Sequence, residues 1–481
     1  MSSIKINIIL NIINTITGIL FPIITFPYAT RILLPNGIGT IHFLQSIINY
    51  IILLTSIGIP MYAVREVAKH RDNIDVRNQT TIEILLLSLI LCTLGYIIAI
   101  ILNFIIPQIT SNSDIFWILS LSIIFTSIGI NWFYQAIEDF KYITYRAIIF
   151  RILCTASLFI FVHTPADLEA YAWITVGATV GNNFINFIHL RKYISVKNII
   201  WRNLRIWRHL KPALHIFILN IIISLYTNLN TTMLGFIQDN SAVGYYTAGN
   251  KISNIILNII TSIGVVLLPR CSNLIETKQK EKFSSITQKT YQLVIAFSLP
   301  CLCGLIVFAP SIITLFCGTE FLEAVPVLQW TAPVILFIGL SNVVGLQILY
   351  PQNKENIVIW STIGGALFNL ILNIWLIPKY SFIGTGISTF TAELVVLIIQ
   401  LIVGYKYIPF KLFRPAILKY IKATCIMTIA ILIINTISTS YWINLTIGSL
   451  TVFFIYIGLL YLMKDELLKE IFNSIKRKVS T

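Results

Sequence analysis

Long apolar runs recur from one end of the 481-residue chain to the other, and each has about the 20 residues that a helix needs to cross the hydrocarbon core of a bilayer. Short polar connections separate the runs. The composition fits this pattern, because 57% of the residues are hydrophobic and only 11% are charged. The sequence therefore predicts an all-α polytopic membrane protein.

Fourteen of these runs are predicted to be transmembrane helices. They cover residues 8–30, 38–63, 80–107, 114–137, 144–162, 170–190, 213–236, 243–269, 288–316, 324–350, 356–377, 381–404, 416–437 and 441–463.

The positions of the lysines and arginines support this number. All but three of the 34 fall at the N terminus, in the even-numbered connections or after the last helix. The connection between the fourth and fifth helices is assigned Lys141, Arg146 and Arg151. The odd-numbered connections hold only Arg31 and Lys379, and Lys251 lies within a helix. By the positive-inside rule both termini are cytoplasmic. Membrane topology thus accounts for the net charge of +15, and no nucleic-acid partner is expected.

The seven cysteines lie in or beside apolar runs and form no CxxC motif. We interpret them as small core residues, and we expect no metal or cofactor. The N-terminal apolar stretch lacks a small-residue cleavage site, which predicts a retained first helix rather than a signal peptide.

The helix predicted over residues 243–269 carries a lysine, Lys251, inside an otherwise apolar run. An ammonium group in hydrocarbon is costly, so such a lysine indicates a functional site. Because successive helical residues are 100° apart, a polar set shares about one third of the circumference: Thr247, Asn250, Lys251, Asn254, Asn258 and Thr261. We predict that this face lines a wet cavity for a polar substrate. Snorkelling of Lys251 toward the outer surface is the alternative.

Polar residues at helical spacing occur in other predicted helices. These candidates are Asn11 and Asn14 in the first helix, Asn220 and Ser224 in the seventh, and Glu393 in the twelfth. Contacts between helices are the alternative role for such residues. Arg31, at the outer end of the first helix, is predicted to be either a cavity residue or an interfacial anchor.

Short motifs recur at a similar offset, which indicates a duplication. Thr55-Ser56-Ile57-Gly58 recurs as Thr261-Ser262-Ile263-Gly264, and Ile38-Gly39 corresponds to Val243-Gly244. Six helices per copy place both copies in the same orientation, with the substrate site expected between them. The predicted domains are an N-terminal six-helix lobe over 1–190, a cytoplasmic basic linker over 191–212, a C-terminal six-helix lobe over 213–408, and an additional helix pair with a cytoplasmic tail over 409–481. Trp201 and Trp207 are interleaved with basic residues in the linker, a pattern typical of a segment that lies on anionic lipid.

Four blocks of the sequence resemble a known family. They read RILLPNGIGTIHFLQSIINY, TSIGIPMYAVREVAKHRDN, GINWFYQAIEDFKYITYRAIIFR and TTMLGFIQDNSAVGYYTAGNKISNIILNIITSIGVVLLPR. They are similar to the polysaccharide transporter (Wzx-type) flippases of the multidrug/oligosaccharidyl-lipid/polysaccharide exporter superfamily. The resemblance implies a MATE-like V of two six-helix lobes in a bacterial inner membrane. It also implies that a polyprenyl-diphosphate-linked oligosaccharide, for O-antigen, capsule or exopolysaccharide, moves from the cytoplasmic to the periplasmic leaflet by alternating access. Many members have twelve helices, which leaves the role of the last pair open.

The candidate residues suit such a substrate. A lysine offers a flexible point charge to a diphosphate, and amides and hydroxyls offer donors and acceptors to sugars. The sequence contains no Walker motif, so the expected drive is H⁺ or Na⁺ coupling, the membrane potential or consumption of the product. Glu393 and Lys251 are the coupling candidates. The expected partners are the lipid-linked oligosaccharide, membrane lipid, a polysaccharide polymerase and glycosyltransferases.

Three alternatives remain open. An ion-coupled multidrug exporter of the same superfamily would need mainly acidic cavity residues, because most of its substrates are cations. A peptidoglycan lipid-precursor flippase would share the fourteen helices. A polytopic glycosyltransferase or polymerase would need catalytic carboxylates or arginines in a sizeable external loop, and the predicted external connections are short. We therefore expect a transporter and not an enzyme.

Overall fold

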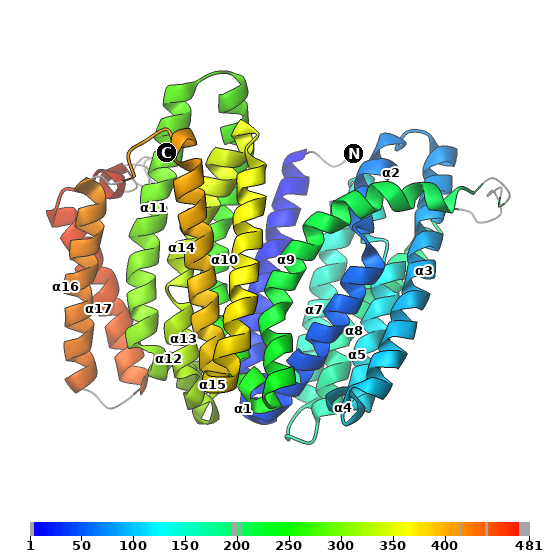
Figure 1. The fold of residues 1–481 in the computed structure, drawn as a ribbon, viewed down its shortest axis with the longest axis horizontal. Coiled ribbons are helices and arrows are strands. Elements are labelled where there is room, and N and C mark those ends of the chain that lie inside the picture. Colours follow the sequence, from blue (N-terminus) through cyan, green and yellow to red (C-terminus); the bar gives the residue numbers. More distant parts are fainter. Residues whose placement is uncertain (1–3, 195–200, 202–203, 413–414, 438–440, 471–481) are drawn as a thin grey trace. The chain divides into compact units, whose positions relative to one another are not determined.

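The computed structural model describes residues 4–194, 201, 204–412, 415–437 and 441–470. Every regular element in these ranges is a helix, as Figure 1 shows. The chain divides into two compact units, Met1–Gly244 and Tyr245–Thr481, and each is described by itself. The predicted lobe and linker boundaries stay a prediction.

Unit 1 is built from long apolar helices joined by short amphipathic ones. Its elements are α1 (Ile4–Ser56), α2 (Ile59–Lys69), α3 (Ile74–Ile105), α4 (Pro107–Thr110), α5 (Ser113–Ile128), α6 (Asn131–Ala136), α7 (Phe140–Phe161), α8 (Leu168–Leu190), η3 (Ile206–His209), α9 (Leu210–Ile237) and the start of α10 (Asn240–Glu276).

Unit 2 continues along α10 and contains the remaining helices. They are α11 (Lys280–Val307), α12 (Ala309–Cys317), η4 (Thr319–Ala324), α13 (Val325–Thr331), α14 (Val334–Asn342), the π-helix η5 (Val343–Leu349), η6 (Tyr350–Gln352), α15 (Glu355–Gly404), η7 (Tyr405–Tyr407), α16 (Pro415–Ile437) and α17 (Tyr441–Leu462).

Two of these helices, α1 and α15, are helical hairpins. The backbone of α1 leaves the helical region at Leu34 (φ 61°), directly before Pro35. The ring centroids of Phe26 and His42 lie 6.3 Å apart, whereas 16 residues of straight helix would span about 24 Å. The backbone of α15 breaks in the same way at Ser381 (φ 49°), and the hydroxyl of Ser388 bonds the amide oxygen of Asn373 across the turn. Each hairpin therefore supplies two of the predicted spans.

Nine helical segments in the described part of the chain are long and apolar enough to cross a membrane, and two of them contain these hairpins. The prediction of an all-α polytopic membrane protein is confirmed. The number fourteen stays a prediction, with which the helices are consistent.

A tightly packed cap closes one end of unit 1, and it consists of α2, α6 and η3. Two of its helices begin where the preceding long helix breaks at a left-handed residue, Gly58 (φ 69°) before α2 and Ile130 (φ 37°) before α6. The buried rings of Trp132, Phe133 and Tyr134 fill the cap together with apolar residues of α2 and α3. Two of the four family-like blocks thus fold against each other.

The repeated Thr-Ser-Ile-Gly motif adopts two different conformations. In the first copy the chain turns at Ile57 and Gly58, and Gly58 packs against the backbone of Ala213 and Phe217 at the start of α9. In the second copy α10 continues without a break through Gly264, which packs against the side chain of Asn342. The sequence after the motif also differs, because Pro60 follows the first copy and cannot donate a helical hydrogen bond; this proline and the tertiary contacts of Gly58 both favour the turn.

In the second recurring motif, the glycine of each copy packs against the backbone beside the other copy. A Cβ on Gly39 would overlap the carbonyl group of Asn240, and a Cβ on Gly244 would overlap the carbonyl oxygen of Pro35. Positions 35 and 240 are 205 residues apart, as are positions 39 and 244. The contact is therefore reciprocal between the two copies of the motif, and it requires glycine on both sides.

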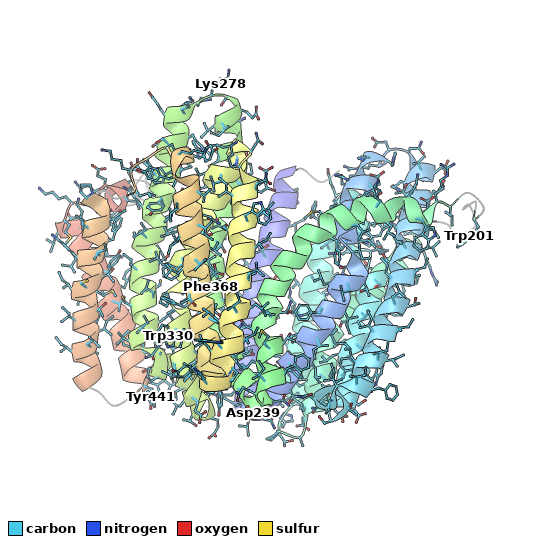
Figure 2. The ribbon with its side chains drawn as sticks, viewed as in Figure 1. Trp201, Asp239, Lys278, Trp330, Phe368 and Tyr441 are labelled. Carbon is cyan, nitrogen blue, oxygen red and sulfur yellow. The ribbon has the colours of Figure 1, made fainter. Side chains whose placement is uncertain are left out.

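The end of α10 and the start of α11 form a helical arm in unit 2. Both helices continue into the arm without interruption, and only residues 277–279 join them. Figure 2 labels Lys278 at the tip of the arm.

Candidate functional site

The predicted polar face of α10 is a different face from the one through which this helix packs in unit 2. On the packed side, Gly249 lies against Val327 of α13, and the hydroxyls of Ser253 and Thr331 are 2.8 Å apart. Ile260 continues this side against Gly339 of α14. These residues and the polar set are centred about 130° apart around the helix, because successive residues are 100° apart.

Exposure follows the same division. Asn254 and Asn258 are exposed, and Thr247, Asn250 and Lys251 are half-buried. Asn254 and Asn258 therefore lie on a part of α10 that its neighbours in unit 2 leave open. Lys251 is the twelfth of the 37 residues of α10, well inside an apolar helix.

A second cation lies inside a helix of unit 1, and counting charges by connection missed it. Arg146 and Arg151 were assigned to the connection before the fifth predicted helix, but α7 begins at Phe140 and includes both. The assignment is wrong because α7 carries its first charges within the helix. Arg151 is the twelfth of the 22 residues of α7, so it lies near the middle of a membrane-spanning segment.

Neutral oxygens of α1 hold one edge of the Arg151 guanidinium. Its Nη1 atom donates to the backbone oxygen of Asn14 at 2.9 Å and to the side-chain oxygen of Asn14 at 3.1 Å, and it also bonds the hydroxyl of Thr17. The other edge lies beside Gly18, where a Cβ would be at ordinary contact distance, 3.4 Å from Nη2. Arg151 forms no ion pair among the described residues, and its side chain is only half-buried. A guanidinium held in this way can still offer donors to an anion.

Arg146 has a structural environment. It is only 7% exposed, and its Nε and Nη2 atoms donate to the side-chain oxygens of Asn182 and Asn131 at 3.0 and 3.1 Å. Its guanidinium lies 5.0 Å from the ring centroid of Tyr142. Arg146 thus joins α6, α7 and α8 at the base of the cap.

Glu393 is buried at 6% exposure on the second half of α15. Buried polar side chains form hydrogen bonds within this hairpin and with α14. Asn369, Asn373 and Ser388 bond one another, and Gln400 bonds Ser361 of α15 and Ser341 of α14. The buried side chain of Gln347 in the π-helix η5 finds no hydrogen-bond partner in the described chain. Buried polar groups are costly unless they are satisfied, so this interior suits a small polar guest or an ion.

The other predicted site residues are dispersed. Arg31 is exposed three residues before the break in α1. The side chains of Asn11, Asn220 and Ser224 lie outside the described residues. The structure therefore joins Asn14 to Arg151 and places the six residues of the polar set on the single helix α10, and among the described residues it brings no further candidates together. Among the described residues no group of His, Cys, Asp or Glu is arranged to hold a metal ion.

The criterion that selected Lys251 would also have found Arg151. Arg151 lies well inside the predicted span 144–162, but it was counted with the loop charges. The candidate functional groups are thus a cation within a long helix of each unit, Arg151 and Lys251, with amide and hydroxyl groups beside each one. Such groups bind anionic and hydroxylated molecules, and they bring no nucleophile and base together.

The comparisons with known proteins agree with a site for anionic and hydroxylated molecules. The family model described as Polysaccharide biosynthesis protein matches residues 4–275, and the MatE model matches residues 216–375. A candidate O-antigen transporter of Escherichia coli (strain K12) is 27% identical over 383 residues, which are 78% of this chain and 91% of that protein.

Two solved structures share the fold. Lipid II flippase MurJ in an inward closed conformation has a TM-score of 0.73 at 14% identity, over 96% of this chain and 100% of that one. An inward-facing multidrug resistance MATE family transporter of the MOP superfamily has a TM-score of 0.66 at 14% identity, over 81% and 94%. At this identity the likeness concerns the fold alone, and the predicted MATE-like fold class is confirmed.

Proposed function

We propose, from the premise that this chain belongs to the polysaccharide biosynthesis protein family, that it is a flippase for polyprenyl-diphosphate-linked oligosaccharides. The unit that it moves is the repeat of an O-antigen, a capsule or an exopolysaccharide. It works by alternating access in a bacterial inner membrane, with both termini cytoplasmic. The observation that carries the proposal is a mid-helix cation accompanied by amide and hydroxyl groups, Lys251 in α10 and Arg151 in α7.

The chemistry of the substrate explains this set of residues. A diphosphate and its sugars cannot cross hydrocarbon unaided, because an isolated charge there costs many kcal/mol. Each cation can stabilise an anionic phosphate, Arg151 with a planar fork and Lys251 with a point charge. Asn250, Asn254 and Asn258 exchange hydrogen bonds with sugar hydroxyls.

The balance of charges favours this function over the export of cationic drugs. The two mid-helix groups that are half-buried, and so accessible, are both basic, whereas the mid-helix carboxylate of Glu393 is buried. Flipping of a peptidoglycan precursor is the second candidate, because that substrate is also a lipid-linked diphosphate. Glu393 is proposed as the residue that couples transport to H⁺ or Na⁺, and the polymerase and glycosyltransferases are proposed as functional partners.

Deletion of the gene tests the function. In a host that depends on this protein for its surface polymer, we expect the lipid-linked repeat unit to accumulate on the cytoplasmic leaflet and the polymer to disappear. Oxidation of the sugars by a membrane-impermeant reagent, in spheroplasts and in open membranes, measures the leaflet. Normal polymer in the deletion strain would contradict the proposal. Arrest of cell-wall synthesis would assign the peptidoglycan precursor instead.

Substitution of Lys251 tests its role in the same assay. We expect Lys251→Ala to lower polymer export about tenfold, because a hydrogen bond to a charged group contributes about 1.5–3 kcal/mol. Lys251→Arg keeps the charge and should export more than Lys251→Ala at the same protein level. Lys379→Ala, at the exposed turn of the α15 hairpin, is the control and should export normally. Equal export by Lys251→Ala and Lys251→Arg would return Lys251 to a snorkelling role.

A further inference from the structure

Residues 204–211, which we call the strap, contain η3 of the cap and the first two residues of α9. The surrounding stretch from 191 to 211 contains seven lysines and arginines and no acidic residue. The strap leads directly into the seventh predicted transmembrane helix. It therefore lies at the boundary between the bilayer and water, on the side that the charges predict to be cytoplasmic.

A buried carboxylate holds the strap in place. The Glu83 side chain of α3 is 0% exposed, and three residues of the strap bind it. The backbone N–H of Arg205 donates to Oε1 at 2.9 Å, and Nη2 of Arg208 lies 2.7 Å from Oε2. His209 places Nε2 at 2.8 Å from Oε2 and Nδ1 at 2.7 Å from the hydroxyl of Tyr62 in α2. We call this network the clamp.

The clamp decides which side chains of the strap face outward. Residues three apart eclipse each other in a 3₁₀-helix, so Ile206 and His209 share the side that packs on the cap. Trp207 and Arg208 occupy the other sides, and the side chain of Trp207 is 63% exposed. The Arg205 side chain is also exposed, because only its backbone enters the clamp. The strap thus presents a tryptophan between two arginines.

At the end of a transmembrane helix, the lipid headgroup layer suits both an exposed indole and the cations beside it. Tryptophan favours the headgroup layer of a bilayer, where its ring is partly apolar and its N–H remains wet. Arginine is attracted to anionic lipids in the cytoplasmic leaflet. Arg208 already neutralises Glu83, which leaves the side chain of Arg205 to contact a lipid phosphate.

We infer that the strap is a docking surface for anionic phospholipid headgroups, with Trp207 inserted among the headgroups and Arg205 bound to phosphate. The clamp fixes this surface to α2 and α3, so that the cap and the first turn of α9 share one anchor on the membrane. An acidic protein partner is the other occupant that the charge would fit, and the experiment distinguishes the two.

Tryptophan quenching in nanodiscs tests the inference with the full-length protein. The chain has nine tryptophans, so the signal of Trp207 is the difference between the wild type and Trp207→Phe. Discs contain brominated phosphatidylglycerol in unlabelled phosphatidylcholine, or the reverse. We expect the Trp207 signal to be quenched by brominated phosphatidylglycerol more strongly than by brominated phosphatidylcholine at equal mole fraction. Arg205→Gln, which leaves the clamp intact, should lower this preference about fivefold.

Two results would overturn the inference. A Trp207 signal that neither lipid quenches would show that the strap does not lie on the bilayer, and would leave its charge for an acidic protein. Equal quenching by the two lipids, unchanged in Arg205→Gln, would show insertion without recognition of anionic headgroups. Thermal melting of each variant verifies folding, and both substitutions change exposed side chains only.

Discussion

Replacing Arg151 by glutamine is expected to lower polymer export at least about tenfold, because the loss of a charge-assisted hydrogen bond to phosphate removes about 1.5–3 kcal/mol. The glutamine amide can still donate to Asn14 and preserve the contact between α1 and α7. The effect should therefore appear as accumulated lipid-linked oligosaccharide, at an unchanged amount of protein in the membrane.

Three further variants separate the charge of Arg151 from its contacts. Arg151→Lys keeps the charge without the planar fork and should export at an intermediate rate. Asn14→Ala removes one acceptor but leaves the backbone oxygen of Asn14, so export should fall little. Lys141→Gln, at the exposed start of α7, should export normally. Full export by Arg151→Gln would show that Arg151 serves only to hold α1 against α7.

Replacing Glu83 by alanine is expected to lower the free energy of unfolding by about 3 kcal/mol or more, because the substitution leaves a buried polar network without its charged partner. The comparison is Glu470→Ala, which breaks the exposed ion pair with Lys289. That exposed pair should contribute less than about 1 kcal/mol. Chemical or thermal unfolding of the purified protein in detergent measures both changes.

The pH dependence of the clamp follows from His209. Burial lowers the pKa of His209 below its ordinary value, although the carboxylate of Glu83 acts in the opposite direction. The folded state therefore binds fewer protons than the unfolded state. The contribution of His209 to stability is complete above the unfolded pKa of about 6.5, and it is lost as the pH falls through the lower folded value. His209→Gln should remove this dependence. If Glu83→Ala lowers the free energy of unfolding by no more than Glu470→Ala does, the clamp makes no contribution to stability.

The long helices and both hairpins could be predicted from the sequence, because apolar length and the alternation of charge constrain them directly. The turn at Leu34 falls in the connection predicted for residues 31–37, and Ser381 directly follows the connection predicted for residues 378–380. The π-helix η5 was not predicted, and neither was the break at Ile57 and Gly58, which interrupts the predicted span 38–63. The break depends on contacts of Gly58 with Ala213 and Phe217, which are distant in the sequence, as well as on Pro60.

The candidate site was only partly predictable. The polar face of α10 has a helical period and could be found from spacing alone. The clamp joins Glu83 to His209 across 126 residues, and no local pattern connects them. Arg151 was assigned to a connection together with its neighbours Lys141 and Arg146, because a cluster of basic residues is typical of a cytoplasmic loop. Its depth becomes evident once α7 is known to begin at Phe140.

The helical arm has a practical consequence for imaging this 54.5 kDa protein, which offers little mass outside the membrane for particle alignment. The 37 residues of α10 would be about 55 Å long as a straight helix, which exceeds the roughly 30 Å hydrocarbon thickness of a bilayer. Because α10 and α11 both run unbroken to the tip, a rigid helical domain grafted in place of residues 277–279 would continue both helices without a flexible joint. Such a fusion would carry the orientation of the last turns of α10, beyond Pro269, out into solvent as a visible marker.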